Sequence, residues 1–442
     1  MIRRLLSTTL ISTTLGLMAF ASNPAFADCV EGGTNVYTCT GSDTNGVRDN
    51  DTGVRVTILT GATVSNTADE AVRVRGTGAV VTNNGRIVTT VADVEGIDAR
   101  TRLTVVNTGT IDTNGRGIDT RGYDGLTLTN SGTIIAVNKA VRAGFSTDAA
   151  TAGQFGDNNT IVNSGLIKSL TNEGIEGADN NAITNTATGT IAALDDAIQI
   201  DENAIILNDG LIENIGGAGD DPQDAIDIDS GYVRNGATGI IRSTFGDAID
   251  FDQGDFAAKI DNYGVISGQI GILVEKGGSV DPANLQAQTV NNWGMITGTS
   301  GIALDLGAGD DVLNQYAGGK IIGGADFGEG ADISNIIGAL TGTLGQGGLF
   351  DGGAGIDLLS FDSYNFDDIV SVLLGLDDTY QLTLNNGTTT LSLFLRSWDN
   401  FDFQGTRYSQ NQITAIAAVP LPAAGLMLLG GLGLLAGLRR KR

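Results

Sequence analysis

The 442-residue chain contains no histidine and only two cysteines. Without histidine, a Ser-His-Asp triad, a Cys-His nucleophile pair and imidazole-ligated zinc or iron sites are excluded. Any catalysis would have to use carboxylates, lysine, arginine, tyrosine or a bound metal.

Aromatic residues are also scarce, at 5%, whereas glycine is abundant, with 65 residues. This composition favours many turns and a slim core over a bulky globule. Basic residues number only 25 against 51 acidic ones, which gives a net charge of −26. Such a surface repels nucleic acid and anionic lipid and attracts cations, so no nucleic-acid partner is expected.

The first residues have the pattern of an export signal. Arg3 and Arg4 precede an apolar stretch, residues 5–20, and residues 25–27 (Ala-Phe-Ala) fit a signal-peptidase site. We therefore expect a signal peptide over residues 1–27 and a mature chain that starts at Asp28. Export favours a disulfide between Cys29 and Cys39, and two free thiols are the alternative.

The last residues read VPLPAAGLMLLGGLGLLAGLRRKR. The apolar run 423–438 would be roughly 24 Å long as a helix, which is short for a ~30 Å bilayer core. Four basic residues, 439–442, would hold its end in the cytoplasm. A proline motif, an apolar helix and a basic stop together form a tripartite sorting signal.

This tail resembles the VPLPA-CTERM signal, a relative of PEP-CTERM, with the motif Val419, Pro420, Leu421, Pro422 and Ala423. The resemblance implies that an exosortase-type enzyme removes the apolar helix that follows this motif, after transient contact with the inner membrane of a Gram-negative bacterium. It also implies a destination at the cell surface, in the outer envelope or outside the cell. A plain C-terminal membrane anchor is the alternative.

An internal repeat dominates the region between these signals. An asparagine followed by a glycine and then an isoleucine recurs at nearly regular intervals along the chain. The asparagines are Asn83, Asn107, Asn130, Asn163, Asn185, Asn208, Asn235, Asn262, Asn292 and Asn314. An aliphatic residue lies two positions before each of these asparagines, up to Val312 before Asn314. A further column of aliphatic residues, one in each repeat, runs from Ile97 to Ile302.

Each repeat contains three short β-prone segments separated by Gly, Asn and Asp turns, and none has helical periodicity. One such unit cannot bury its own apolar face, but stacked copies can, at ~4.8 Å per rung. The predicted fold is an all-β, right-handed parallel β-helix of about ten rungs, with inward asparagines bonded along the axis. A β-propeller would need about 40 residues per unit.

The third segment of each repeat places acidic residues on the outside. If Ile226 and Ile228 point inward, Asp227 and Asp229 point outward. In early rungs Asp98 can pair with Arg121, and Asp119 with Arg100. The later rungs stack five acids, Asp201, Asp229, Asp252, Glu275 and Asp305. Stacked like charges should bind cations such as calcium, raise carboxylate pKa values, or remain a screened, solvated surface.

Calcium is also suggested by three glycine-rich segments. Residues 352–360, GGAGIDLLS, resemble the nonapeptide of RTX β-rolls, which makes Asp357 a further candidate ligand. Residues 307–313 are a partial copy and 328–332 a weaker one. Because the copies do not follow one another directly along the chain, they resemble isolated turns, for which plain Gly-Asp turns are the alternative.

Solenoid ends must be capped. We expect an N-terminal cap over residues 28–61, the β-helix over 62–324, a C-terminal β cap with RTX-like turns over 325–409 and a linker over 410–418. Ten of the 24 aromatic residues lie between residues 350 and 409 and should form the core of this cap, with a glycan-binding aromatic face as the alternative.

The expected function is that of an exported structural or adhesive rod at the cell surface, without enzymatic activity, whose targets are polysaccharide or cell surfaces. The repeats resemble passenger regions of autotransporter-like adhesins, although the C-terminus carries a sorting tail instead of a β-barrel. An extracellular polysaccharide lyase or glycoside hydrolase of the pectin-lyase-like β-helix type is the alternative. No catalytic residues are predicted, because a site is usually a local exception to a repeat.

Overall fold

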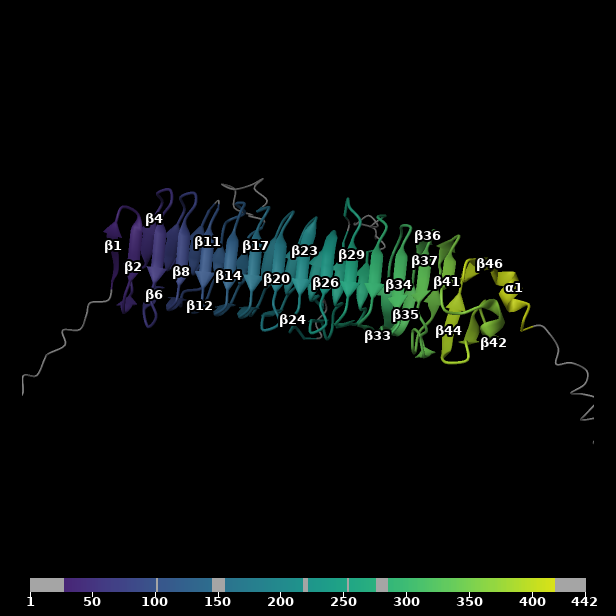
Figure 1. Ribbon diagram of the computed structural model, residues 1–442. Coiled ribbons are helices and arrows are strands. Elements are labelled where there is room, and N and C mark those ends of the chain that lie inside the picture. The colour runs from purple at the N-terminus through teal and green to yellow at the C-terminus, as the bar shows by residue number, and fades with distance from the viewer. Residues whose placement is uncertain are drawn as a thin grey trace, which may run out of the picture.

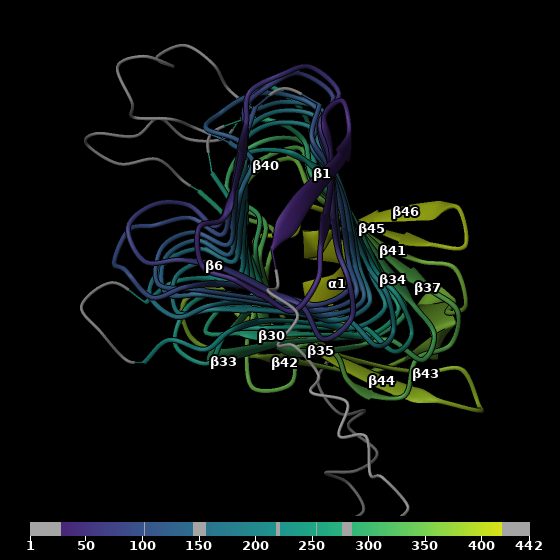
Figure 2. The same ribbon diagram turned by 90° about the vertical axis from the view of Figure 1, so that its left-hand side faces the viewer.

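The computed structural model describes residues 28–100, 102–144, 156–217, 222–252, 254–275 and 285–417. The predicted signal peptide and sorting signal lie outside these residues. The described chain is a β-solenoid of about 12 turns, with 51% strand and 2% helix. Figure 1 shows the turns stacked side by side from the N-terminal to the C-terminal end. In Figure 2, along the axis, successive turns superimpose.

One side of the solenoid is a continuous sheet of parallel strands, most of which end at the inward asparagine of their repeat. The strands are β2 (Val36–Cys39), β5 (Arg55–Ile58), β8 (Val80–Asn83), β11 (Thr104–Asn107), β14 (Thr127–Asn130), β17 (Thr160–Asn163), β20 (Ala182–Asn185), β23 (Ala204–Asn208), β26 (Gly231–Asn235), β29 (Lys259–Asn262), β32 (Thr289–Asn292), β34 (Val312–Tyr316), β37 (Ile333–Ile337), β41 (Leu358–Phe361) and β45 (Asn400–Phe403).

The second strand of each turn follows the first, and in most turns it carries the regularly spaced isoleucine inward. These strands are β3 (Ser42–Asp43), β6 (Thr63–Asn66), β9 (Arg86–Thr89), β12 (Thr110–Thr113), β15 (Thr133–Ala136), β18 (Leu166–Ser169), β21 (Thr190–Ala193), β24 (Leu211–Asn214), β27 (Ile240–Arg242), β30 (Val265–Gly268), β33 (Met295–Asp305) and β35 (Lys320–Asp326).

The third strand of each turn is short and positions the acidic residues. These strands are β4 (Val47–Asp49), β7 (Val72–Val74), β10 (Ile97–Ala99), β13 (Ile118–Asp119), β16 (Val141–Arg142), β19 (Ile175–Gly177), β22 (Ile198–Ile200), β25 (Ile226–Ile228), β28 (Ile249–Phe251), β31 (Ile272–Val274) and β39 (Phe350–Asp351). The ends of β33 and β35 continue this series.

The predicted asparagine ladder is confirmed for nine of its ten members. Each Nδ2 donates to the next Oδ1 at 2.7–3.0 Å, from Asn83 to Asn292, and these side chains are 0% exposed. The tenth rung was misassigned. Asn292 bonds to Gln315 at 2.8 Å, whereas Asn314 pairs in register with the neighbouring Asn291 on the outside. Leu313, not Val312, fills the core there, because side chains alternate along a strand.

Stacking continues beyond both predicted boundaries, which explains the difference from ten rungs. β2 and β5 pair in parallel with the strands that follow them, within the expected N-terminal cap. β37, β41 and β45 continue the same sheet within the expected C-terminal cap.

The N-terminal end is closed by β1 (Cys29–Gly33), which runs antiparallel to β2. A disulfide joins Cys29 to Cys39 across this pair.

The C-terminal end is closed by an antiparallel meander of β42 (Ile369–Leu374), β43 (Tyr380–Asn385) and β44 (Thr390–Arg396). A 3₁₀ turn η1 (Phe366–Asp368), β46 (Thr406–Ser409) and a short helix α1 (Gln410–Thr414) complete it, together with β38 (Gly342–Thr343). Seven of its aromatic residues are buried, so they form a core as expected: Phe350, Phe361, Tyr364, Tyr380, Trp398, Phe401 and Phe403.

Candidate functional site on the third strands

A single row of polar side chains runs along the outward face of the third strands. We call it the polar row, and register pairs its members one turn after another. Leu273 is its one apolar member. The row consists of Arg48, Arg73, Asp98, Asp119, Arg142, Glu176, Gln199, Asp227, Asp250, Leu273, Asp305, Asp326, Asp351 and Arg396.

In the N-terminal half of the polar row, arginines neutralise the acids. Asp98 accepts from Arg121 Nε at 2.9 Å, as predicted, and also from Arg75. The predicted partner of Asp119 was wrong. Arg142 binds Asp119 through two contacts of 2.9 and 2.6 Å, whereas Arg100 donates to the hydroxyl of Tyr123. Arg142 is one strand along in the same row and can therefore meet both carboxylate oxygens.

In the central turns the polar row contains no arginine, and a second row, made of acidic residues, lies beside it. Asp201, Asp229, Asp252 and Glu275 follow one another directly after the third strands, and we call them the acidic row. Backbone bonds run between these turns, including Asp229 N to Asp201 O at 3.2 Å and Glu275 N to Phe251 O at 2.9 Å. These four predicted ligands thus occupy successive rungs.

Asp305 was assigned to the wrong row. It lies opposite Leu273 and Asp326 and so belongs to the polar row. The cause is a register irregularity within β33, where the core position of the third strand passes to Leu304. Ile302, the expected core residue, is 36% exposed, so two extra residues precede the inward position.

Outward orientation does not make these carboxylates fully solvated. Asp98 and Asp119 are 0% exposed, and Asp227, Asp229 and Asp250 are half-buried. Burial, followed by the charge of Asp252, raises the pKa of Asp227 to about 7. Burial and the neighbouring carboxylates raise the pKa of Asp229 and of Asp201 to about 7 as well.

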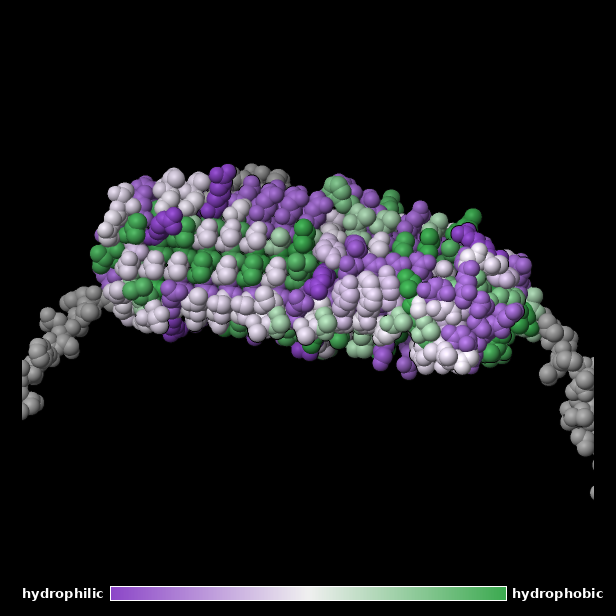
Figure 3. Space-filling model, viewed as in Figure 1, coloured by the Kyte–Doolittle hydropathy of each residue, from purple (hydrophilic) through white to green (hydrophobic). Residues whose placement is uncertain are grey.

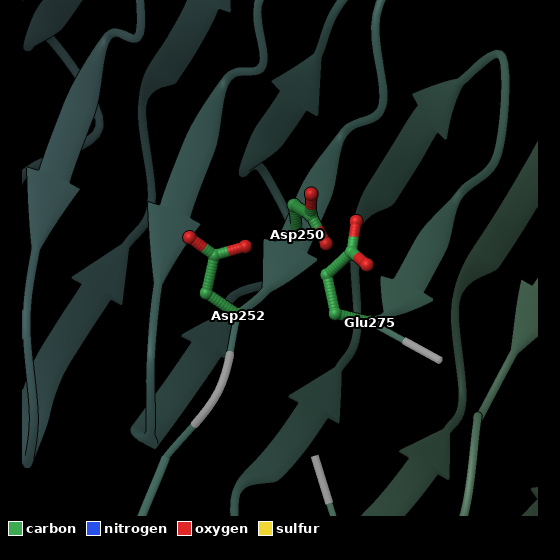
Figure 4. Close-up of side chains that lie close together, drawn as sticks. All are labelled: Asp250, Asp252 and Glu275. Atoms are coloured by element: carbon green, nitrogen blue, oxygen red, sulfur yellow. The ribbon is translucent and has the colours of Figure 1, made fainter. Parts of the chain in front are cut away.

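Three carboxylates converge where the two rows meet, as Figure 4 shows. One oxygen from each of Asp250, Asp252 and Glu275 lies within 4.8 Å of the others. Burial, and then the charges of Asp224 and Asp227, raises the pKa of Asp250 to about 10. Its Oδ1 is buried and has no hydrogen-bond partner in the described chain. Clustered oxygen ligands of this kind suit a hard cation such as calcium.

A line of aspartates that the repeat analysis did not single out runs beside this cluster. Asp196, Asp224 and Asp247 each precede a third strand by two residues. Each accepts the backbone N–H of the next turn, at 2.8, 2.5 and 2.7 Å. Their signal in the sequence is the motif Asp-Ala-Ile, which recurs in these three turns. Burial is the main cause that raises the pKa of Asp196 and Asp224 to about 8.

Asp357 lies apart from both rows, at an inside corner immediately before β41, and is 0% exposed. The glycine-rich segments are not isolated turns, contrary to the expectation. Ala308 forms a parallel bridge with Glu329, and β36 (Glu329–Gly330) pairs with β40 (Ala354–Gly355). These segments are adjacent because their separation along the chain is about the length of one solenoid turn.

The opposite surface of the rod is flat and uncharged over its N-terminal half. From β8 to β23 the outward side chains are Val80, Thr82, Thr104, Val106, Thr127, Thr129, Thr160, Val162, Ala182, Thr184, Ile205 and Leu207. We call these residues the neutral face. Figure 3 shows it as parallel apolar and weakly polar rows, which give way to hydrophilic residues farther along.

A hollow of about 440 Å³ lies between the last turns and the C-terminal cap. Its lining includes Lys320, Leu340, Thr343 and Leu391 and contains no carboxylate. It therefore does not coincide with either row of acids.

No helix in the described part of the chain combines the length and apolar character needed to cross a bilayer. No family model, curated protein or solved structure matches the chain. The β-solenoid and the geometry of its surfaces are therefore the observations from which function has to be inferred.

Proposed function

We propose that this protein is an exported structural or adhesive rod of the bacterial cell surface or extracellular matrix, processed at its VPLPA-CTERM-like tail. The main support is that the acids of the candidate site belong to the repeat. Asp227 and Asp250 occupy the same position on successive turns, and Asp196 and Asp224 beside them each accept a backbone N–H of the next turn. A catalytic site would instead be expected as a local departure from the repeat.

We propose the neutral face as the adhesive surface, with neutral polysaccharide as its target. The chain carries a net charge of −26, so approach of a second surface is opposed least where no charge is exposed. The twelve outward side chains of this face are uncharged and repeat at the ~4.8 Å spacing of the turns. A regular surface of this kind can contact a polymer at many equivalent points.

The test is retention of the purified protein on insoluble neutral polysaccharides. We expect the wild type to bind, and the double variant Thr129→Glu and Ile205→Glu to bind several-fold less with an unchanged melting temperature, because both side chains are exposed. A matched variant with Leu376→Glu and Thr388→Glu adds the same charge at exposed positions elsewhere and should bind like the wild type. Equal binding by all three proteins would contradict the proposed surface.

A carbohydrate-cleaving enzyme is the second candidate. One observation favours it, namely the three carboxylates Asp250, Asp252 and Glu275, whose oxygens lie within 4.8 Å. Retaining glycosidases hold two carboxyl groups about 5 Å apart, one with a raised pKa. The test is whether the purified protein releases soluble or unsaturated sugars from acidic or neutral polysaccharide. Release that is lost in the variant Asp250→Asn would show that the protein is an enzyme and not a scaffold.

A further inference from the structure

The inside corner before the first strand of each turn is occupied by a column of polar side chains. Each side-chain oxygen accepts the backbone N–H of the same position one turn earlier. The column includes Asn159, Asn181, Gln288, Asp311, Asp332 and Asp357, and the strands that follow its last four members are in register. All six side chains are 2% exposed or less.

The amide members of this column use their second polar atom as a donor. Asn181 Nδ2 donates to the carbonyl of Ala178, three residues earlier, at 2.5 Å. Asn159 Nδ2 donates to Ala143 O at 3.0 Å and to Gly156 O, which is also three residues earlier. Gln288 Nε2 donates to Gln286 O at 2.9 Å. An inside corner of this solenoid thus offers carbonyl oxygens that require a donor.

The aspartates cannot supply that donor when ionised. Oδ1 of Asp311, Asp332 and Asp357 accepts the backbone N–H at 2.6, 2.7 and 3.0 Å, as in the amide members. Oδ2 of each is buried and has no hydrogen-bond partner in the described chain. The second oxygen therefore takes the place of an amide nitrogen, and no ion pair to it is formed among the described residues. A buried acceptor of this kind is costly.

The turns that lead into these aspartates share the pattern D-x-G-x-G-x-D, at residues 305–311, 326–332 and 351–357. Their glycines allow very close stacking of backbone oxygens. A Cβ on Gly328 would lie 1.7 Å from Gly307 O, and a Cβ on Gly330 would lie 1.8 Å from Gly309 O. The same Cβ position on Gly330 lies 3.1 Å from Asp332 Oδ1, so a carbonyl oxygen of one turn and a carboxylate oxygen of the next meet at this corner. Carboxylate and carbonyl oxygens are the ligands that calcium prefers.

We propose that Asp311, Asp332 and Asp357 form a column of internal calcium sites between the last turns of the solenoid, separate from the acidic row. The cation takes the place that the amide nitrogen holds at Asn159 and Asn181. It bridges the buried carboxylates to oxygens of the stacked turns. This inference concerns how the end of the rod is held together and does not depend on the proposed adhesive function.

The test compares thermal unfolding and calcium titration calorimetry of the purified protein and the triple variant Asp311→Asn, Asp332→Asn and Asp357→Asn, with EDTA-treated samples as the starting point. In EDTA at pH 7.5 the variant should melt higher than the wild type, because an amide restores the donor seen at Asn181. Millimolar CaCl₂ should raise the melting temperature of the wild type, and the variant should lose at least half of that rise and of the calorimetric binding.

A matched control carries Asp51→Asn, Asp255→Asn and Asp367→Asn, three exposed acids outside the column, and should respond to calcium like the wild type. The variant Asp229→Asn with Asp252→Asn leaves the corner aspartates intact. Calcium should therefore still raise its melting temperature. Calcium binding that is absent from the wild type, or fully retained by the corner variant, would overturn the proposal. A wild type that responds to pH alone and not to calcium would show that protons fill these positions, and would overturn it equally.

Discussion

At the scale of single residues, burial decides whether a polar side chain of the repeat is structural. Asn208 is 0% exposed, donates to Asn235 at 2.9 Å and to the carbonyl of Gly210, and accepts from Asn185. Asn114, in contrast, is exposed and donates one bond to Thr90 O. The same residue type therefore holds neighbouring turns together in one place and contributes little in another.

We expect Asn208→Ala to lower the free energy of unfolding by about 1 to 3 kcal/mol, because it leaves the neighbouring amides of the ladder without partners in a buried position. Urea unfolding monitored by circular dichroism measures the change. Asn114→Ala is the control and should alter stability by about 0.5 kcal/mol or less. Equal stability of both variants would contradict a stabilising ladder.

Arg142 and Arg242 provide a second comparison at this scale. The Arg142–Asp119 pair is buried, with side-chain exposures of 8% and 0%, whereas the Arg242–Glu213 pair has exposures of 50% and 18%. We expect Arg142→Met to cost about 3 to 5 kcal/mol, because it leaves the buried carboxylate of Asp119 without its two-contact partner. Arg242→Met should cost less than about 1 kcal/mol in the same urea experiment. A small effect of both substitutions would show that Asp119 is neutralised by other groups.

At the scale of the strands, β22, β25 and β28 stack acids whose burial opposes ionisation. Burial, and then neighbouring carboxylates, raises the pKa of Asp201, Asp227 and Asp229 to about 7, against an ordinary value of 3.8. A carboxyl group that binds its proton more tightly in the folded state stabilises the fold where it is protonated. That contribution is complete below about pH 4 and is lost as the pH rises through about 7.

We therefore expect the melting temperature in EDTA and low salt to fall as the pH rises from 5 to 8. The double variant Asp227→Asn and Asp229→Asn should show a shallower fall, because two of the titrating groups are removed. Differential scanning calorimetry at matched ionic strength measures both curves. A wild-type melting temperature that is constant or rises over this interval would contradict the raised pKa values.

At the scale of the whole molecule, the rod has a neutral face, an acidic side and two closed ends. The N-terminal end is closed by β1 and its disulfide, and the C-terminal end by the aromatic core of the meander. At the N-terminal end, β1 runs antiparallel to the stack and is irregular in register, which disfavours the addition of a further parallel turn from another chain. The arrangement favours a discrete rod over an open fibre.

The predicted processing of the exported protein also belongs to this scale. We expect the mature form to end near Pro422, because the tail resembles a sorting signal that is removed. Mass spectrometry of C-terminal peptides from protein released from the cell surface measures this directly. Peptides from residues 426–435 in the mature form would instead support a plain membrane anchor.

The repeat by itself determined most of the fold. Three apolar columns and a buried asparagine at nearly constant spacing require stacked parallel strands, because a single unit cannot bury its own apolar face. Side-chain alternation then placed Asp227 and Asp229 on the outside. The positions of the four acids of the acidic row followed from the same counting.

Only the tertiary structure decided features that depend on register and on depth below the surface. The irregularity in β33 moved Asp305 to another row, and alternation in β34 replaced Asn314 by Gln315 in the ladder. Stacking brought together glycine-rich turns that are distant in the sequence. Burial of outward carboxylates also depends on neighbouring turns. Sequence spacing specifies which residues share a position in the repeat, but contact between turns specifies their partners and their exposure to water.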